Sequence, residues 1–524
     1  MPRENDARNS EQNEIFAELE KFERESINST NEEIFREINR FDSLYSNNKS
    51  YFFNVEGIII NIGSRNRNLD LLGYAVKRLR EKIQNNKTSL LFYNIGNALL
   101  SIGDLKVGSN PEFEDLINNQ EYREARKYFK LVTDTTTTPE ARTNYGNILE
   151  KYGRNYEAIL SYDEAIKANP EFGMALGNKG IALTRYFSLA RQKDPKLILY
   201  SRELIKKALE VDNTVKIGGQ SAIDNFNKKL KSLDEYINKH KINVGFRNDL
   251  IPSSKYISFC KNNNIFLNYC FNCYRCEKGL LDEFAPTFIS KKEDSTETDI
   301  LEHGGIPGKI YYSIKILNQI VEDYSTARYI YYLATVEDFN KLDEISKYYS
   351  ALDYCRNSIK YGYLKTSFIK LFNILDKIAH LIWRYYEPSI IKKTYFSSLL
   401  RPEYKEVIKQ RKSYNLLALQ NLAMDFQENG IFFHLNKVRN YLTHDYIDIK
   451  EDLFDYANKD DELNTNHHLT EKLMCLYIND LFDIVKSALI YFVNALYSEM
   501  RNTNKGNKPF QIFVPSQDYI FENK

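Results

Sequence analysis

The amino-acid sequence predicts an all-α protein in which a helical solenoid precedes a helical bundle. Apolar residues recur with the 3.6-residue period of a helix in the first fifty residues, around residues 140–185 and again from residue 341 onward. Glycine and proline, which interrupt helices, are scarce at 21 and 12 of 524 residues. A chain of this length exceeds one ordinary hydrophobic core, so more than one domain is expected.

Residues 1–50 are predicted to form an N-terminal helical cap, because Ile15, Leu19 and Phe22 follow one helical face. The first residues are polar and contain no apolar leader. No later stretch reaches the about 18–20 apolar residues of a membrane span. These features predict a cytoplasmic protein that does not contact a membrane.

The clearest internal order lies in the run ARTNYGNILEKYGRNYEAILSYDEAIKANPEF. Counted from Gly146, Ala158 follows after twelve residues, Tyr162 after sixteen, Ala165 after nineteen and Pro170 after twenty-four. This is the spacing of a tetratricopeptide repeat. In such a repeat, small residues let two antiparallel helices approach closely, and the proline ends the second helix.

A second repeat opens in phase at Gly180, thirty-four residues after Gly146, and a more divergent one precedes them around Gly96. At least about three such units are needed to bury a continuous core, so residues 51–215 are predicted to form a tetratricopeptide-repeat solenoid. Polar residues on its concave face would bind a protein partner or trigger, or else only solvate the superhelix. They are Asn144, Asn147, Asn178 and Lys179.

Residues 216–340 are predicted to be an irregular linker or subdomain that contains a cysteine cluster. Six cysteines in a chain of this length do not make a disulfide framework, which predicts reduced thiols or metal ligands. Four thiolates would suit one structural zinc ion; the alternative is that they are small core thiols. The four cysteines are Cys260, Cys270, Cys273 and Cys276.

Residues 341–501 are predicted to form an all-α bundle, followed by a polar tail at 502–524. Its long periodic runs include SFIKLFNILDKIAHLIW and LTEKLMCLYINDLFDIVKSALIYF. Over the whole chain, 72 Lys and Arg nearly balance 71 Asp and Glu, so any site for a polyanion must be local. Common hydrolase motifs are absent, and GGIPGKI departs from a phosphate loop because Ile310 replaces the Ser or Thr that would hold Mg²⁺.

The run KVRNYLTHDY carries the candidate catalytic residues. Arg439, Asn440 and His444 follow the pattern Arg, polar, three residues, His. RNA supplies its own nucleophile, the 2′-hydroxyl, so its cleavage needs a base, an acid and a cation for the phosphorane charge. Histidine can act as acid or base near neutral pH, and a guanidinium can bind two phosphate oxygens, so no metal cofactor is required. The neighbours expected to contact RNA are Lys437, Tyr441 and Tyr446.

The spacing of Arg439 and His444 poses a geometric problem. Five residues on an ideal helix turn about 140° beyond one full turn, so the two side chains do not share a face. Either the helix ends between them, or a second copy of the chain completes the site across a two-fold axis.

The segments FFHLNKVRNYLTHDY and LDKIAHLIWRYY resemble the HEPN superfamily of small all-α ribonuclease domains, most closely the branch preceded by tetratricopeptide repeats. The resemblance covers the last third of the chain. It implies a homodimer in which Arg439 and His444 of both protomers form a metal-independent ribonuclease site. In that site Arg439 would stabilise the phosphate, His444 would be the acid or base, and Asn440 would be the polar position. It also implies a toxin of a bacterial defence or toxin–antitoxin system, regulated by a protein partner or trigger through the repeats.

The competing hypothesis is a noncatalytic scaffold that binds a protein partner through its repeats and dimerises through its bundle. Other polar residues are expected to have structural roles. We expect His380 at a helix interface, and His467 and His468 in a solvated loop. His434 is expected to cap the surface or else to line the same groove as Arg439 and His444. Asp376 and Lys377 are expected to form an ion pair. The sequence does not define the RNA target, the trigger or the need for an activator.

Overall fold

The computed structural model describes residues 2–45, 48–189, 195–242, 254–267, 287–290, 308–345, 348, 355, 357–386, 394–450, 467–503 and 510–513. In these residues the fold is all-α, as the sequence predicts, with two short strand pairs beside the helices. The chain divides into two compact units, residues 1–183 with 201–236 and residues 184–200 with 237–524. No helix in the described ranges is both long enough and apolar enough to cross a membrane.

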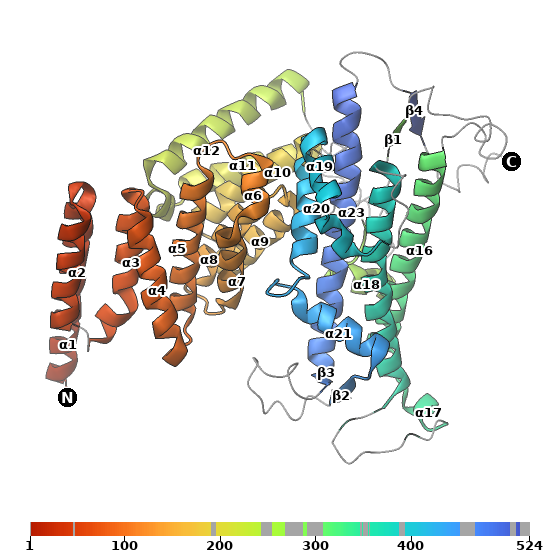
Figure 1. Cartoon of the computed structure of the whole chain (residues 1–524), viewed down its shortest axis with the longest axis horizontal. Helices are drawn as coiled ribbons and strands as arrows, with labels where there is room; N and C mark the ends of the chain where they lie inside the picture. Colours follow the sequence, from red (N-terminus) through yellow and green to blue (C-terminus); the bar gives the residue numbers. More distant parts are fainter. Residues whose placement is uncertain are drawn as a thin grey trace. The chain divides into compact units, whose positions relative to one another are not determined.

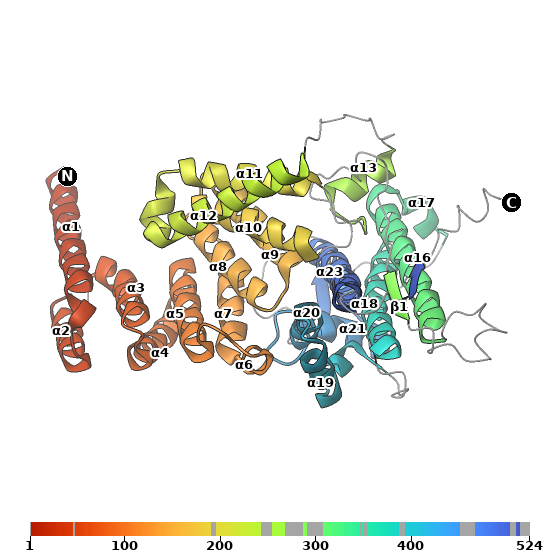
Figure 2. The ribbon, with the colours of Figure 1, turned by 90° about the horizontal axis from the view of Figure 1, so that it is seen from above.

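The first unit is built from helices that follow one another along the chain, the last three of which extend past its limits (Figures 1 and 2). They are α1 (Pro2–Glu25), η1 (Ser26–Asn28), α2 (Asn31–Tyr45), α3 (Lys49–Arg65), α4 (Leu69–Asn85), α5 (Ser89–Val107), α6 (Phe113–Asn118), α7 (Gln120–Leu131), α8 (Thr138–Lys151), α9 (Asn155–Ala168), α10 (Gly173–Leu189), α11 (Pro195–Glu210) and α12 (Asn213–His240).

Three helix pairs of this unit pack through a glycine on the first helix and a large side chain on the second. A Cβ atom on any of these glycines would lie 2.5–2.6 Å from the opposite side chain, which is closer than real contacts allow. The pairs are Gly96 with Phe129, Gly146 with Tyr162, and Gly180 with Ile205. The helices therefore approach as the spacing from Gly146 suggests, while their assignment as tetratricopeptide repeats stays a prediction.

The polar residues predicted on the concave face bond to groups of neighbouring helices. The Asn144 amide donates to Asn97 Oδ1 over 2.7 Å, and the Asn178 amide donates to Asn147 Oδ1 over 3.0 Å. Lys179 forms an ion pair with Asp163. These bonds link α5, α8 and α10, so a partner that used these groups would have to compete with them.

The second unit contains α13 (Lys255–Asn262) and then the helices of the bundle: α16 (Gly308–Val336), α17 (Asn340–Asp343), α18 (Ile359–Tyr386), η3 (Phe396–Leu400), α19 (Pro402–Arg411), α20 (Tyr414–Met424), α21 (Phe433–His444) and α23 (Glu471–Thr503). Its strands are β1 (Thr287–Ser290), β2 (Asp448–Lys450), β3 (His468–Thr470) and β4 (Phe510–Phe513). β1 pairs antiparallel with β4, and β2 pairs parallel with β3.

Three long helices, α16, α18 and α23, form the centre of the bundle and lie side by side (Figure 1). The Ser367 hydroxyl on α18 donates to the Ala327 carbonyl on α16 over 3.0 Å. Phe482 on α23 places its ring centroid 5.2 Å from that of Tyr324 and 5.9 Å from that of Tyr331. These helices are separated along the chain, so the core of this unit depends on non-local contacts.

Two long helices, α12 and α16, lie largely within residues 216–340, which the sequence predicts to be irregular. That prediction was wrong for both. Along α16, buried residues recur at alternating steps of three and four, which indicates one packed helical face. They include Ile310, Ser313, Leu317, Ile320, Tyr324, Ala327, Tyr331 and Ala334. In α12, Gly219 has a φ of 65°, a conformation that glycine readily adopts, and it bends the helix.

Candidate functional site

The candidate catalytic residues lie on α21, which packs against α18 (Figure 1). Leu435 and Val438 are fully buried and fix the inward face of α21. The helix runs through Arg439 and ends at His444, so it does not end between them. The first of the two geometric alternatives is therefore excluded, and within one protomer the two side chains leave the helix about 140° apart.

Arg439 is half-buried, whereas Asn440 and His444 are exposed. The Arg439 guanidinium donates to Asn440 Oδ1 over 3.1 Å and lies 5.7 Å from the centroid of the Phe372 ring. The Phe372 ring limits the positions that the Arg439 guanidinium can take on the side that faces α18. Arg439 thus presents a partly fixed positive charge beside an exposed amide, which suits a phosphate ligand.

Asp376 lies on the same face of α18 as Phe372, four residues earlier, and acts on Arg439 electrostatically. Burial raises the pKa of the Asp376 carboxyl, while its bond from the Phe396 backbone N–H, at 2.7 Å, and the Arg439 charge oppose that rise. Asp376 therefore connects α18, η3 and the candidate arginine. The sequence did not indicate this role.

The expected ion pair between Asp376 and Lys377 was wrong. Lys377 Nζ lies 2.6 Å from Asp323 Oδ2 on α16, and Lys370 Nζ lies 3.2 Å from Asp323 Oδ1. Consecutive residues on a helix point about 100° apart, so Asp376 and Lys377 face different neighbours.

The residues expected to contact RNA surround the same end of the bundle. The Lys437 ammonium lies 5.2 Å from the Phe433 ring centroid, so its charge stays on the α21 surface. Tyr441 and Tyr446 place their ring centroids 4.2 Å and 5.0 Å from that of His467. With 57% of its surface exposed, Tyr446 leaves a face on which a base could stack.

His467 is the residue near the site that sequence reasoning misjudged. It was expected to be solvated, but it packs on two tyrosines, and its Nδ1 lies 3.5 Å from Asp445 Oδ2. Its φ of 52° is unusual for a residue other than glycine. These contacts join segments separated along the chain, and no local periodicity signals them.

His380 and His434 have structural environments. The Nδ1 atom of His380 lies 3.1 Å from Thr394 Oγ1, and burial lowers its pKa. His434 stacks on Tyr477 of α23 with ring centroids 4.8 Å apart, and burial lowers its pKa to about 4. His434 is therefore a half-buried contact between α21 and α23, not a surface residue as expected.

Of the four cysteines proposed to hold zinc, Cys260 is fully buried on α13. Around it, Tyr256 and Phe259 pack their rings on tyrosines of α16. Cys270, Cys273 and Cys276 lie outside the described residues. The surroundings of Cys260 fit the alternative of a small core thiol.

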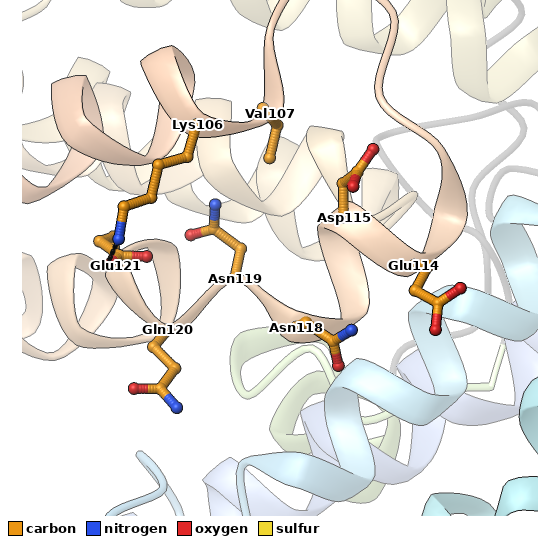
Figure 3. A pocket seen from close by; sticks show the side chains of 8 residues that line it. All are labelled: Lys106, Val107, Glu114, Asp115, Asn118, Asn119, Gln120 and Glu121. Carbon is orange, nitrogen blue, oxygen red and sulfur yellow. Dashed lines mark hydrogen bonds and ion pairs between the residues drawn. The ribbon is translucent and has the colours of Figure 1, made fainter.

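A hollow of about 320 Å³ lies in the first unit, between the end of α5, α6 and the start of α7 (Figure 3). Its lining includes Glu114 and Asp115, and Lys106 is paired with Glu121 over 2.6 Å. Paired and acidic groups do not favour a polyanion, so this hollow does not suit RNA.

Residues 307–499 match a family model described as LA2681-like HEPN. The match begins at residue 307 and so includes α16. The start that the sequence predicts for the bundle, residue 341, leaves α16 outside it. Neither the curated proteins nor the solved structures contain a match to the chain. HEPN domains are typically ribonucleases that act without a metal ion, and they usually dimerise. Residues 307–499, the C-terminal bundle, are therefore similar to LA2681-like HEPN, and HEPN domains typically have a nuclease-type function on RNA.

Proposed function

We propose that this protein is a metal-independent endoribonuclease of a bacterial defence or toxin system, with its active site formed by Arg439 and His444 of two protomers. The observation that carries the proposal is the placement of the pair on α21 of the HEPN domain. Arg439 is held beside Phe372 and Asp376, and His444 is exposed at the end of the same helix.

The helix geometry supports a site that two protomers share. Because the two side chains diverge by about 140° on one α21, the Arg439 of one protomer would act with the partner subunit's His444. Two α21 helices related by a two-fold axis bring two Arg/His pairs into one groove. In each pair, one His444 acts first as base and then as acid.

The reaction balances without a metal ion. One His444 takes the proton of the RNA 2′-hydroxyl, and the 2′-oxygen forms a bond to the adjacent phosphorus. The bond from phosphorus to the 5′-oxygen breaks, and the same His444, now protonated, donates its proton to that oxygen. Arg439 stabilises the negative charge that develops on the phosphorane oxygens. The products are a 2′,3′-cyclic phosphate and a 5′-hydroxyl.

The residues around the pair have supporting roles in this proposal. Asn440, which accepts from Arg439, orients the guanidinium or the phosphate. Lys437 provides a charge for the RNA backbone, and Tyr441 and Tyr446 provide aromatic surface. The N-terminal helices bind a protein partner or trigger that controls the cleavage. Asn144, Asn147, Asn178 and Lys179 are the polar groups proposed for that contact.

The test is cleavage of total RNA by the purified full-length protein in EDTA. We expect Arg439→Ala and His444→Ala each to lower the rate by at least about 100-fold, as loss of one group that stabilises a transition state does. Arg36→Ala and His240→Ala are matched controls, because both residues are exposed and lie on α2 and at the end of α12, away from α21 in the sequence. Cleavage that both site variants leave unchanged would contradict the site.

Expression in bacteria tests the toxin role separately. We expect the wild-type chain to inhibit growth and Arg439→Ala or His444→Ala to relieve the inhibition at equal protein level. A chain that neither cleaves RNA nor inhibits growth, with or without cell extract as a source of activator, would favour the noncatalytic scaffold instead.

A further inference from the structure

Three potential metal ligands converge at the short pair of β2 and β3. They are Cys355, which precedes α18, Asp448 at the start of β2, and His468 at the start of β3. Cys355 Sγ lies 3.5 Å from His468 Nδ1, and that nitrogen lies 3.9 Å from Asp448 Oδ2. All three ligand atoms lie within 4.8 Å of one another.

These separations are close to those of a tetrahedral zinc site. With Zn–S near 2.3 Å and Zn–N and Zn–O near 2.0 Å, tetrahedral angles place S and N about 3.5 Å apart and N and O about 3.3 Å apart. The distance between Cys355 Sγ and His468 Nδ1 already equals the 3.5 Å expected for S and N. The separation between His468 Nδ1 and Asp448 Oδ2 exceeds its tetrahedral value by about 0.6 Å, and a change of the Asp448 χ angles can shorten it.

The donor set also selects the class of cation. A thiolate and an imidazole favour zinc over magnesium or calcium, which prefer oxygen ligands. One thiolate and one carboxylate neutralise the two charges of Zn²⁺, and three protein ligands leave a fourth position for water. All three residues are half-buried, so the cation is only partly exposed to solvent.

Lys365 is the charged group that opposes a cation here. Burial lowers the pKa of its ammonium group, while the Asp448 and Cys355 charges oppose that effect. Lys365 therefore lies near Asp448 and Cys355, the two anionic groups that would also hold the cation. Because its side chain is long and flexible, it can turn away when a divalent ion replaces its charge.

We propose that Cys355, Asp448 and His468 form a binding site for Zn²⁺. The ion would join three segments of the bundle: the segment that precedes α18, the strand that follows α21, and the strand that leads into α23. Asp448 lies only four residues after His444. The ion would thus fix the chain just beyond the end of α21, without taking part in catalysis. This site uses none of the cysteines at 260–276 and does not depend on the proposed ribonuclease activity.

The first test follows the Cys355 thiol in the wild-type, metal-stripped, full-length protein. Iodoacetamide labelling, read by mass spectrometry of the peptide that contains Cys355, is compared with and without one equivalent of Zn²⁺. We expect Zn²⁺ to slow the labelling of Cys355 at least about tenfold, because a ligated thiolate is shielded, and EDTA to restore it. Equal labelling rates would overturn the proposal, and this readout requires no variant to fold.

The second test identifies the ligands with Co²⁺ as the probe. A thiolate ligand gives a charge-transfer absorption band, which we expect in the wild type and in Cys475→Ser but not in Cys355→Ser. Removal of one ligand should weaken Zn²⁺ binding at least about 100-fold, since even changes beyond the direct ligands cost about 10–100-fold. Asp448→Asn and His468→Gln should also weaken it. A band that persists unchanged in Cys355→Ser would show that the ion is held elsewhere, such as at Cys270–Cys276, and the proposal would fail.

Discussion

The N-terminal helices and the C-terminal bundle are stabilised by contacts of opposite range along the chain. In the first unit, Gly146 packs on Tyr162 of the next helix, and similar contacts join the neighbouring pairs. In the bundle, the Lys486 ammonium bonds to Asn264, 222 residues away, and α23 packs on α18 and, through Phe482, on the tyrosines of α16. An array of local pairs can change or lose one pair and keep the others, whereas a bundle of distant helices is stabilised as a whole.

The two regions also treat polar groups differently. In the first unit, Arg78 is paired with both Asp42, at 2.6 Å, and Glu56, at 2.9 Å, and Lys82 also reaches Glu56. Such buried charges are stable only when they are compensated. On α21 of the bundle, Asn440 and His444 are exposed, and Arg439 is only half-buried. Arg78, Asp42 and Glu56 are thus compensated inside the first unit, whereas Asn440 and His444 leave polar groups at the surface of α21.

The largest expected effect is loss of the bundle's non-local core. Phe482→Ala removes the ring that contacts both Tyr324 and Tyr331, and such a cavity costs about 3–5 kcal/mol. We expect hydrogen exchange to become faster throughout α16, α18 and α23 but not in α8 and α9. Leu476→Ala on the same helix is the control, because Leu476 is 53% exposed. Faster exchange confined to α23 would contradict the cooperative bundle.

The next effect in size is a pH dependence of the bundle through His434. Burial lowers its pKa to about 4, whereas an unfolded histidine titrates near 6.5. The unfolded chain then binds more protons between these values, so stability is full above about pH 6.5 and is lost as pH falls toward 4. The shift corresponds to about 3 kcal/mol.

His434→Gln should therefore reduce the difference in urea midpoint for the bundle between about pH 7 and about pH 4.5. His240→Gln, at the exposed end of α12, should leave that difference as in the wild type. An unchanged difference in His434→Gln would show that protonation of this residue does not control the acid response.

The smallest effect should stay local. Gly146→Ala places a methyl group 2.6 Å from the Tyr162 ring, and such overpacking costs about 1–3 kcal/mol. The helix preference of alanine offsets only about 0.5–1 kcal/mol of that cost. At Gly73 an added methyl group meets open space, so Gly73→Ala should be more stable than the wild type by about 0.5–1 kcal/mol. Hydrogen exchange should become faster in α8 and α9 and stay unchanged in α16. If Gly146→Ala and Gly73→Ala changed stability by the same amount, the close contact between Gly146 and Tyr162 would be contradicted.

Much of the fold could be predicted from local patterns. The spacing from Gly146 anticipated the approach of α8 and α9, and the runs after residue 341 anticipated α18 and α23. α16 was missed, although its buried face repeats at three and four residues, because Ser313 and its tyrosines obscure the apolar pattern. The Gly/Pro turn before it also suggested irregular structure.

The candidate site was predicted less completely. Arg439 and His444 are proposed from one local pattern, and the structure adds that both lie within α21. The contacts of Arg439 with Phe372 and of Tyr441 with His467 join segments that only the tertiary fold brings together. No periodicity of a single segment could have shown them. The different orientations of Asp376 and Lys377, by contrast, follow from helix geometry and could have been predicted.

The central claim is that Arg439 of one protomer acts with the partner subunit's His444. Its most direct test mixes purified Arg439→Ala and His444→Ala proteins after subunit exchange and measures RNA cleavage in EDTA. A mixed dimer retains one intact pair, so an equal mixture should recover about a quarter of wild-type activity, while each variant alone stays inactive. A mixture that remains as inactive as its components, although mixed dimers are shown to form, would contradict a site shared between protomers.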